Sequence, residues 1–298
     1  MKIGYPCINL SLNCKGNRTF RLKSYSEERL IERVENNLDC LDKVLRFNLK
    51  HNILFFRMTS DLVPFASHPI CQFNWQDHFK EKFQQIGDFI NNHDIRISMH
   101  PDQFTLINPL DSKIFERSIM ELYYHNEVMD LMSLDSSAKI QIHVGGVYGN
   151  KERSISRFIQ RYNELDKKLK RRLVIENDER LYSVKDCLKI NEKIGIPVLF
   201  DVFHHLLNNY NETINQVLIS VSQTWKEDDG IPMIDYSVQH ENNRQGKHGI
   251  TLDLQNFMKF LKETKPFDFD IMLEIKDKDK SALKAVKIAS YDNRFKSI

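Results

Sequence analysis

A regular alternation of two kinds of segment runs along all 298 residues of the chain. Short apolar runs, typical of buried β-strands, are each followed by a longer stretch in which apolar residues recur at intervals of three and four, as on one face of an amphipathic helix. The stretch SYSEERLIERVENNLDCLDKVLRF contains Ser24 and Glu27 at the spacing of a capping box. The apolar runs are, in order, KIGYPCIN, ILFFRMTS, IRISMH, KIQIHVGG, RLVIEND, PVLFDVFHH, MIDYSVQ and FDIMLEIK.

Eight such repeats over this length predict a (β/α)8 barrel. We therefore expect an α/β fold in which residues 1–298 form a single TIM-barrel domain, with the active site at the C-terminal ends of the strands. An open, doubly wound sheet is the alternative. Neither G-x-G-x-x-G nor G-x-x-x-x-G-K-[ST], the phosphate-binding motifs of such sheets, occurs at a strand–helix turn.

Composition excludes several classes of protein. Hydrophobic residues make up 41% of the chain, enough for a large core, yet no run approaches the roughly 18 apolar residues of a membrane span. The first residues lack the apolar core and cleavage site of a signal peptide, so we expect a cytoplasmic protein with no membrane partner. The net charge of +2 does not by itself require a nucleic-acid partner.

The cysteines are odd in number and none is spaced as C-x-x-C. This pattern favours buried thiols over a disulfide framework or a zinc ribbon. The cysteines are Cys7, Cys14, Cys40, Cys71 and Cys187.

Several predicted strands end on a residue that can bind a metal ion. In ISMHPDQF an apolar run stops at His100 and turns at Pro101. A single histidine or glutamate in such a place is more often a hydrogen-bonded structural residue or a helix cap than a ligand. In a barrel, however, the carboxyl ends of all strands meet at one rim. The polar residues expected at this rim are Asn9, His68, His100, His143, Glu176, Asp201, His204, Asp235, His248 and Glu274.

The number and chemistry of these residues indicate a metal site. Buried carboxylates at one barrel mouth repel one another unless they are protonated or bridged by cations. Neutral imidazoles among carboxylates are ligands that suit Mn²⁺, Zn²⁺ or Fe²⁺. Because the candidates exceed the coordination shell of one ion, we predict a multinuclear site. Glu176 and Glu274 are the predicted catalytic residues, which bridge the ions and orient the attacking water.

Five strings, HPDQFTLINP, HVGGVYGNK, IENDE, FDVFHH and MLEIKDKDK, occur in this order between Tyr5 and about Lys280. Together they resemble the UV damage endonuclease family. The resemblance implies a TIM barrel, related to endonuclease IV, that binds up to three divalent ions, usually Mn²⁺. It implies an enzyme that acts on damaged double-stranded DNA, cutting the backbone immediately 5′ of ultraviolet photoproducts and often at abasic sites. A monomer would suit an enzyme that must embrace a duplex.

Matching motifs carry the functional residues of the family over to this chain. Tyr5 and Asn9 match positions that line the lesion pocket, and Gln103 matches a residue that enters the duplex where the damaged bases leave it. Phe104 stands where the family often has tyrosine; a phenyl ring can still stack there, without the hydroxyl. The implied metal ligands are His68, His100, His143, Glu176, Asp201, His204, His248 and Glu274.

The seventh strand departs from the family. Family members commonly carry Lys-x-His there, with a carboxylated lysine, whereas this chain has Met233 and Asp235. Methionine cannot be carboxylated, but Met plus Asp carries the same single negative charge as a carboxylated lysine plus a neutral histidine. We therefore expect Asp235 to be a metal ligand.

Phosphate contacts on the same rim are expected of a DNA-binding protein. The segment after the first strand, NCKGNRTFRLKSY, supplies Lys15, Arg18, Arg21 and Lys23 around aromatic residues. The more basic run DKKLKRR (166–172) precedes the fifth strand and is therefore expected on the opposite face. Further basic residues of the rim loops are Lys151, Arg153, Arg244, Lys247, Lys276 and Lys278.

Three other functions are compatible with parts of this pattern. An abasic-site endonuclease of the endonuclease IV type would share the barrel, the metals and the phosphodiester chemistry but lack photoproduct recognition. A divalent-metal sugar isomerase would need a closed pocket for a small molecule instead of a basic rim. A non-catalytic metal-stabilised DNA-binding module is disfavoured because structural metal sites are normally closed by four ligands.

Overall fold

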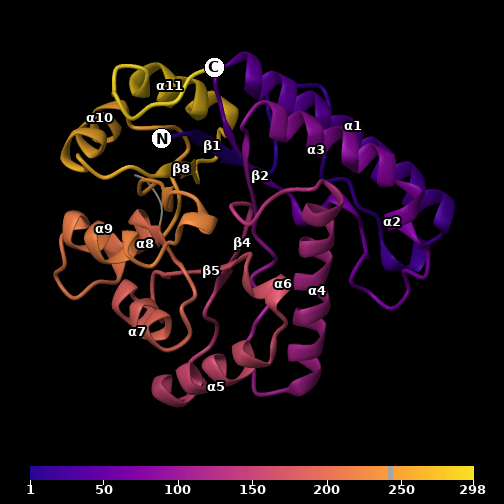
Figure 1. Ribbon diagram of the computed structural model, residues 1–298, viewed down its shortest axis with the longest axis horizontal. Helices are drawn as coiled ribbons and strands as arrows, with labels where there is room; N and C mark the ends of the chain where they lie inside the picture. Colours follow the sequence, from indigo (N-terminus) through magenta and orange to yellow (C-terminus); the bar gives the residue numbers. More distant parts are fainter. Residues whose placement is uncertain (241–243) are drawn as a thin grey trace.

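The computed structural model describes residues 1–240 and 244–298 and contains a closed barrel of eight parallel strands ringed by helices (Figure 1). Neighbouring strands follow the order of the chain, and the first strand closes the ring by pairing with the last, Gly4 opposite Met272. The predicted TIM barrel is therefore confirmed. The strands are β1 (Ile3–Pro6), β2 (Phe55–Met58), β3 (Arg96–Met99), β4 (Lys139–His143), β5 (Leu173–Glu176), β6 (Val198–Asp201), β7 (Met233–Tyr236) and β8 (Asp270–Leu273).

The helices follow one another round the barrel in chain order, so that the colours of Figure 1 pass from indigo to yellow around the ring. The main helices are α1 (Glu27–Lys50), α3 (Lys80–Asn92), α4 (Ser112–Leu131), α5 (Lys151–Glu164), α7 (Val184–Ile194), α9 (Ile214–Ser222), α10 (Leu254–Glu263) and α11 (Asp279–Ala289). Shorter turns are α2 (Trp75–His78), α6 (Lys167–Lys170), α8 (Val202–Leu207) and the 3₁₀ helices η1 (Leu22–Ser24), η2 (Ser60–Leu62) and η3 (Glu227–Asp229).

The first long helix begins two residues later than the sequence suggested. The side chain of Ser26 accepts a hydrogen bond from the backbone N–H of Arg29, so Ser26 is the N-cap and α1 starts at Glu27. The predicted capping box of Ser24 and Glu27 is therefore wrong, because Ser24 belongs to the preceding 3₁₀ helix η1. Serine caps helices well at either position, and spacing alone did not distinguish the two.

Ion pairs between buried residues close the N-terminal end of the barrel. Arg96, the first residue of β3, lies 2.8 Å from Asp270, the first residue of β8. Lys139, the first residue of β4, pairs with Asp229. The short helix α6 immediately precedes β5, so it too lies at this end. The basic run at 166–172 is thus on the face opposite the strand ends, as expected.

Within the described part of the chain, none of the helices has the length and apolar character needed to cross a membrane.

Candidate metal centre

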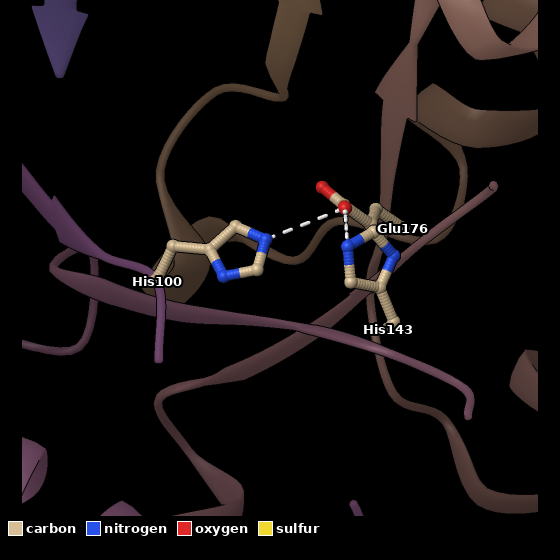
Figure 2. A group of neighbouring side chains, drawn as sticks. All are labelled: His100, His143 and Glu176. Carbon is tan, nitrogen blue, oxygen red and sulfur yellow. Dashed lines mark hydrogen bonds and ion pairs between the residues drawn. The ribbon is translucent and has the colours of Figure 1, made fainter. Parts of the chain in front are cut away.

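Three ligand candidates meet where β3, β4 and β5 end. His100 directly follows β3, while His143 and Glu176 are the last residues of β4 and β5. The Glu176 carboxylate faces both imidazoles, with Oε1 2.8 Å from His143 Nε2 and 3.4 Å from His100 Nε2 (Figure 2). Their potential ligand atoms all lie within 4.8 Å of one another. The alternation of strand residues therefore brings these three side chains to one point, as predicted.

A second group forms where β6, β7 and β8 end. Ligand atoms of Asp201, Asp235 and Glu274 also lie within 4.8 Å of one another. Three carboxylates at this separation repel unless cations lie among them. The second group therefore calls for compensating positive charge.

Two further imidazoles connect the groups. His204 Nδ1 lies 3.3 Å from Asp201 Oδ2, and its ring centroid is 6.4 Å from that of His143. His248 Nε2 lies 3.7 Å from Glu274 Oε2, with its ring centroid 6.0 Å from that of His204. The two groups are thus parts of one continuous array at the barrel mouth.

Backbone carbonyls orient two of the imidazoles. His100 Nδ1 lies 2.7 Å from the carbonyl oxygen of Pro101, and His204 Nδ1 lies 3.1 Å from that of Asn177. A ring nitrogen that donates to a carbonyl leaves Nε2 with its lone pair, which is the form that binds metal. In a neutral ring, these contacts would leave each Nε2 available to a metal ion.

Burial and neighbouring charges favour the protonated forms of several of these groups. Although burial lowers it, the pKa of His143 is raised to about 9 by the Glu176 carboxylate. Burial likewise opposes a rise in the pKa of His204 to about 9, which Asp201 causes. Burial raises the pKa of Asp201 itself to about 7. A divalent cation in the array would displace these protons, as expected where ligands must be deprotonated to bind.

Arg57 is a site residue that the sequence analysis missed. It lies in β2, its side chain is 3% exposed, and its Nη1 pairs with Glu274 Oε1. Its Nη2 donates to both Asp235 oxygens, at 2.7 and 2.9 Å, and to Gln141 Oε1 at 2.6 Å. The signal was a single arginine inside the otherwise apolar run ILFFRM, since arginine is almost never fully buried without a partner.

Gln141 of β4 links the two groups through the barrel interior. Its amide nitrogen donates to Asp235 Oδ2 at 2.6 Å and to Glu176 Oε2. Both Asp235 oxygens therefore already accept hydrogen bonds from protein donors. The carboxylate that the sequence suggested as a ligand is also the partner of a buried guanidinium.

His68 is the candidate that the structure does not join to the others. It is exposed, its Nδ1 accepts a hydrogen bond from the backbone N–H of Ile70 at 3.1 Å, and its ring packs near Phe65. None of its contacts within residues 1–240 and 244–298 reaches another candidate ligand. Its position depends on the path of a loop, which strand periodicity does not predict.

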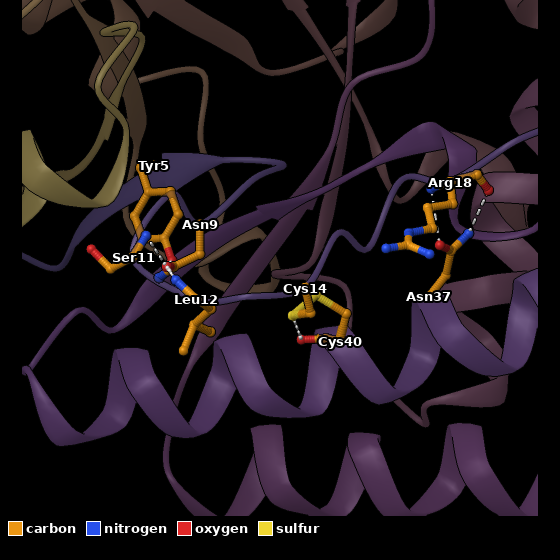
Figure 3. The surroundings of a disulfide bond; sticks show 8 residues. All are labelled: Tyr5, Asn9, Ser11, Leu12, Cys14, Arg18, Asn37 and Cys40. Carbon is orange, nitrogen blue, oxygen red and sulfur yellow. Dashed lines mark hydrogen bonds between the residues drawn. A yellow bond between two sulfur atoms is a disulfide. The ribbon is translucent and has the colours of Figure 1, made fainter.

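Tyr5 and Asn9 are buried beneath the segment that follows β1. The Tyr5 hydroxyl donates to Asn48 Oδ1 at 2.7 Å and accepts from Asn9 Nδ2 at 2.8 Å. The Asn9 side-chain oxygen accepts from the backbone N–H groups of Ser11 and Leu12 (Figure 3). These two residues therefore fix the start of this segment, and their expected contact with a lesion is not visible in this arrangement.

A disulfide bond between Cys14 and Cys40 ties the same segment to α1 (Figure 3). The expectation of unpaired thiols is wrong for these two residues. They are separated by 26 positions and meet only because the segment after β1 folds back along the helix. Of the free cysteines Cys7, Cys71 and Cys187, only Cys187 is buried.

Unlike Tyr5 and Asn9, the other side chains expected to touch DNA after β1 and β3 are exposed. Gln103 and Phe104 follow His100 within four residues, and Phe104 is 73% exposed although it is a large apolar residue. An apolar ring that is this exposed beside a metal-ligand cluster is a candidate for stacking. The basic residues after β1 are also exposed; they are Lys15, Arg18, Arg21 and Lys23.

The fold and the site define a (β/α)8 barrel whose mouth gathers imidazoles and carboxylates from six strands, a donor set that could hold divalent metal ions. Comparison with known proteins narrows this class. The UV-endonuclease UvdE family matches residues 1–297. The chain belongs to this family.

Relatives and solved structures agree with the assignment. The chain is 41% identical to the UV DNA damage endonuclease of Clostridium perfringens (strain 13 / Type A) over 288 residues, 96% of this chain and 70% of that protein. It is 32% identical to the UV DNA damage endonuclease of Bacillus cereus (strain 03BB102), covering 96% of this chain and 94% of the relative. The crystal structure of SacUVDE superimposes with a TM-score of 0.94 at 46% identity, covering 99% of each chain.

More distant structures share the barrel alone. Endonuclease IV from Thermus thermophilus has a TM-score of 0.55 at 12% identity, covering 84% of this chain and 93% of its own. D-Psicose 3-epimerase from Clostridium cellulolyticum H10 has the same TM-score at 9% identity, covering 86% and 94%. Such low identity gives no support to an abasic-site endonuclease or a sugar isomerase over the family already shown.

Proposed function

We propose that this chain, as a single-domain monomeric enzyme of the cytoplasm, hydrolyses the DNA phosphodiester immediately 5′ of ultraviolet photoproducts and at abasic sites. The observation that carries the proposal is the continuous array of imidazoles and carboxylates at the barrel mouth, centred on Glu176. Membership of the UV-endonuclease family supplies the substrate class. The metal is proposed to be Mn²⁺, in a multinuclear site of up to three ions.

The donor set fits such ions, because neutral imidazoles and carboxylates are their usual protein ligands. His68 stays a prediction from the family resemblance, since its described contacts do not join it to the array. The proposed ligands are His100, His143, Glu176, Asp201, His204, His248 and Glu274.

Divalent ions held there would make a nucleophilic water available near neutral pH and relieve charge on the leaving oxygen. Glu176 and Glu274 are proposed to orient that water, since their carboxylates belong to the two different groups of ligands. In the neutral imidazoles that bind metal, the contacts of His100 and His204 Nδ1 with backbone carbonyls favour the tautomer whose Nε2 is available to coordinate. The chain thus supplies ligand geometry and water placement for the hydrolysis.

Asp235 is proposed to act as the counter-ion of Arg57, in place of the metal ligand expected from the sequence. Its two oxygens are occupied by the guanidinium and by the Gln141 amide. The guanidinium in turn contacts Glu274, so it provides positive charge inside the second group of carboxylates. In this proposal, the ion pairs of Arg57 set the charge balance at this point of the site, so a chain with Met233 and Asp235 needs no carboxylated lysine.

Lesion recognition is proposed to rely on extrusion of the damaged bases. Removing stacked bases from a duplex costs a few kcal/mol, least where pairing is already damaged, which selects for damage without recognising sequence. Gln103 and Phe104, which are exposed and near His100 in the sequence, are proposed to fill the vacated stack. Tyr5 and Asn9 are proposed to shape the pocket from beneath, by fixing the segment that follows β1.

Incision of a labelled duplex carrying one defined photoproduct tests the proposal. With Mn²⁺ we expect a nick immediately 5′ of the photoproduct, and with excess chelator no nick, because the array has no other source of an activated water. Undamaged and abasic duplexes are run in parallel. Cutting of the abasic duplex alone would instead support an enzyme of the endonuclease IV type, and the absence of any cutting by metal-loaded protein would contradict the proposal.

The basic segment after β1 is expected to contribute most of the phosphate contacts. Replacing its four basic residues by glutamine should lower affinity for a lesion duplex and reduce the salt dependence of binding by about 0.9 in log–log slope for each phosphate that is no longer neutralised. Fluorescence anisotropy at several salt concentrations measures both effects. The residues replaced are Lys15, Arg18, Arg21 and Lys23.

The matched control is neutralisation of Lys168 and Lys170 in α6, on the opposite face. Affinity should change by less than about twofold, because charges more than a Debye length from the bound phosphates are screened. A large loss of affinity in this control would show that DNA binds the other end of the barrel.

A further inference from the structure

The barrel mouth opens into a cavity of about 480 Å³, which is lined by residues outside the metal-ligand array as well as by members of it. His100, His248 and Glu274 line it from the ligand array, and Arg57 lines it from β2. Lysines complete the lining; they are Lys247, Lys276 and Lys278. A cavity that joins metal ligands to cations is suited to an anion that also approaches the metals.

Lys278 differs from two of the other cations of this cavity, Arg57 and Lys276. The Arg57 guanidinium already forms ion pairs with Asp235 and Glu274, whereas Lys276 is exposed to solvent. Lys278 is half-buried, and in residues 1–240 and 244–298 no carboxylate lies within ion-pair distance of its ammonium. Burial lowers its pKa, which is the sign of an ammonium that has given up water.

The backbone at Lys278 is strained. Its φ of 51° lies in the left-handed region that favours glycine, and its ψ of −115° lies outside the usual left-handed well. Such a conformation is unfavourable in a residue with a side chain. The turn is held by the Lys278 N–H, which donates to the Ile275 carbonyl, so the chain keeps a lysine where glycine would be less strained.

We propose that the Lys278 ammonium binds the scissile phosphate of the DNA substrate directly, making it a catalytic residue of the hydrolysis. This rests on the proposed function. A fixed cation beside the metals would stabilise the charge that grows on the non-bridging oxygens as water attacks phosphorus and the P–O bond to the leaving oxygen breaks. The ammonium stays protonated throughout and takes no part in proton transfer.

The test compares Lys278→Met with Lys280→Met, which makes the same change two residues further on, at an exposed position that does not line the cavity. Single-turnover incision of the photoproduct duplex should fall about 100-fold in Lys278→Met, the size of effect seen when one transition-state donor is removed. Duplex affinity and bound Mn²⁺ should remain within about threefold of the parent, since the many other phosphate contacts remain. Lys280→Met should incise normally.

Lys278→Gly separates a catalytic role from a structural one. Glycine relieves the positive φ, so this variant should melt no lower than the parent protein while losing incision to the same extent as Lys278→Met. If instead both variants incise within about threefold of the parent, Lys278 does not bind the scissile phosphate. If Lys278→Gly melts lower and its loss of incision follows its unfolding, the role is structural and the inference is overturned.

A second measurement distinguishes failure of this inference from failure of the proposed function. Calorimetric titration of inorganic phosphate into the Mn²⁺-loaded protein should show binding in the parent and in Lys280→Met, with at least about tenfold weaker binding in Lys278→Met. If no duplex is cut but this pattern holds, the proposed function fails while Lys278 still marks a phosphate site. If the parent cuts the photoproduct duplex and Lys278→Met binds phosphate equally well, the inference fails and the proposed function stands.

Discussion

Replacing Glu176 by glutamine should lower incision of a photoproduct duplex by about 1,000-fold or more. Glu176 is 2% exposed and its Oε1 faces the imidazoles of both His100 and His143, so it is the common member of the first ligand group. The amide keeps the shape but removes the negative charge that draws cations to this group. Metal-based charge stabilisation is worth several kcal/mol, which corresponds to about three powers of ten in rate.

The measurement is single-turnover incision at saturating Mn²⁺, together with the metal content of the purified variant. Glu179→Gln is the matched control, because the same change is made three residues later at a side chain that is 38% exposed and 3.9 Å from His204 Nε2. The control should retain at least about a third of the rate. Equal losses in the two variants would show that the effect comes from lowering the negative charge near the mouth in general, and that Glu176 has no special role.

Replacing Arg57 by methionine should destabilise the metal-free protein by about 3–5 kcal/mol, the usual cost of leaving a buried charge without its partner. The Asp235 side chain is fully buried and the Glu274 side chain is 20% exposed, so water does little to solvate either negative charge. Burial raises the pKa of Asp235, and Arg57 is the neighbour that lowers it. Without the guanidinium, the pKa of Asp235 should rise further, so that its carboxylate must either be protonated or stay buried without a partner.

Denaturant unfolding in chelator and in Mn²⁺ measures this effect. Metal should recover most of the loss, because cations then stand among the same carboxylates. The double variant Arg57→Met with Asp235→Asn should be more stable than Arg57→Met alone, since the uncompensated charge has been removed. A double variant that is no more stable than the single one would show that the Arg57–Asp235 pair is not the source of the stability.

Asp235→Asn alone decides between the two roles of Asp235. As the counter-ion of Arg57, it should leave the number of bound metal ions unchanged, with Arg57 still paired to Glu274. As a metal ligand, the role expected from the sequence, its replacement should cost bound metal. Metal analysis of the purified variant beside the parent gives the answer.

The barrel and the positions of its chemistry follow from the order of residues along the chain. Eight apolar runs alternating with amphipathic stretches permit few arrangements other than a closed parallel barrel, because each strand must be buried on both faces. In that fold a residue such as His143 or Glu176 at the end of a run must lie at the mouth. The strand-end residues of β3, β4 and β5 could therefore be named as neighbours from periodicity.

The folded chain as a whole decides which groups form ion pairs and which cysteines form a disulfide bond. Arg57 and Asp235 are 178 residues apart and meet because β2 and β7 both point into one barrel interior, a contact that no local pattern records. Cys14 and Cys40 pair because a loop folds along a helix, and the described contacts of His68 lie within its own loop. Strand periodicity fixes directions within a regular element, whereas loop paths and buried ion pairs depend on the packing of the whole chain.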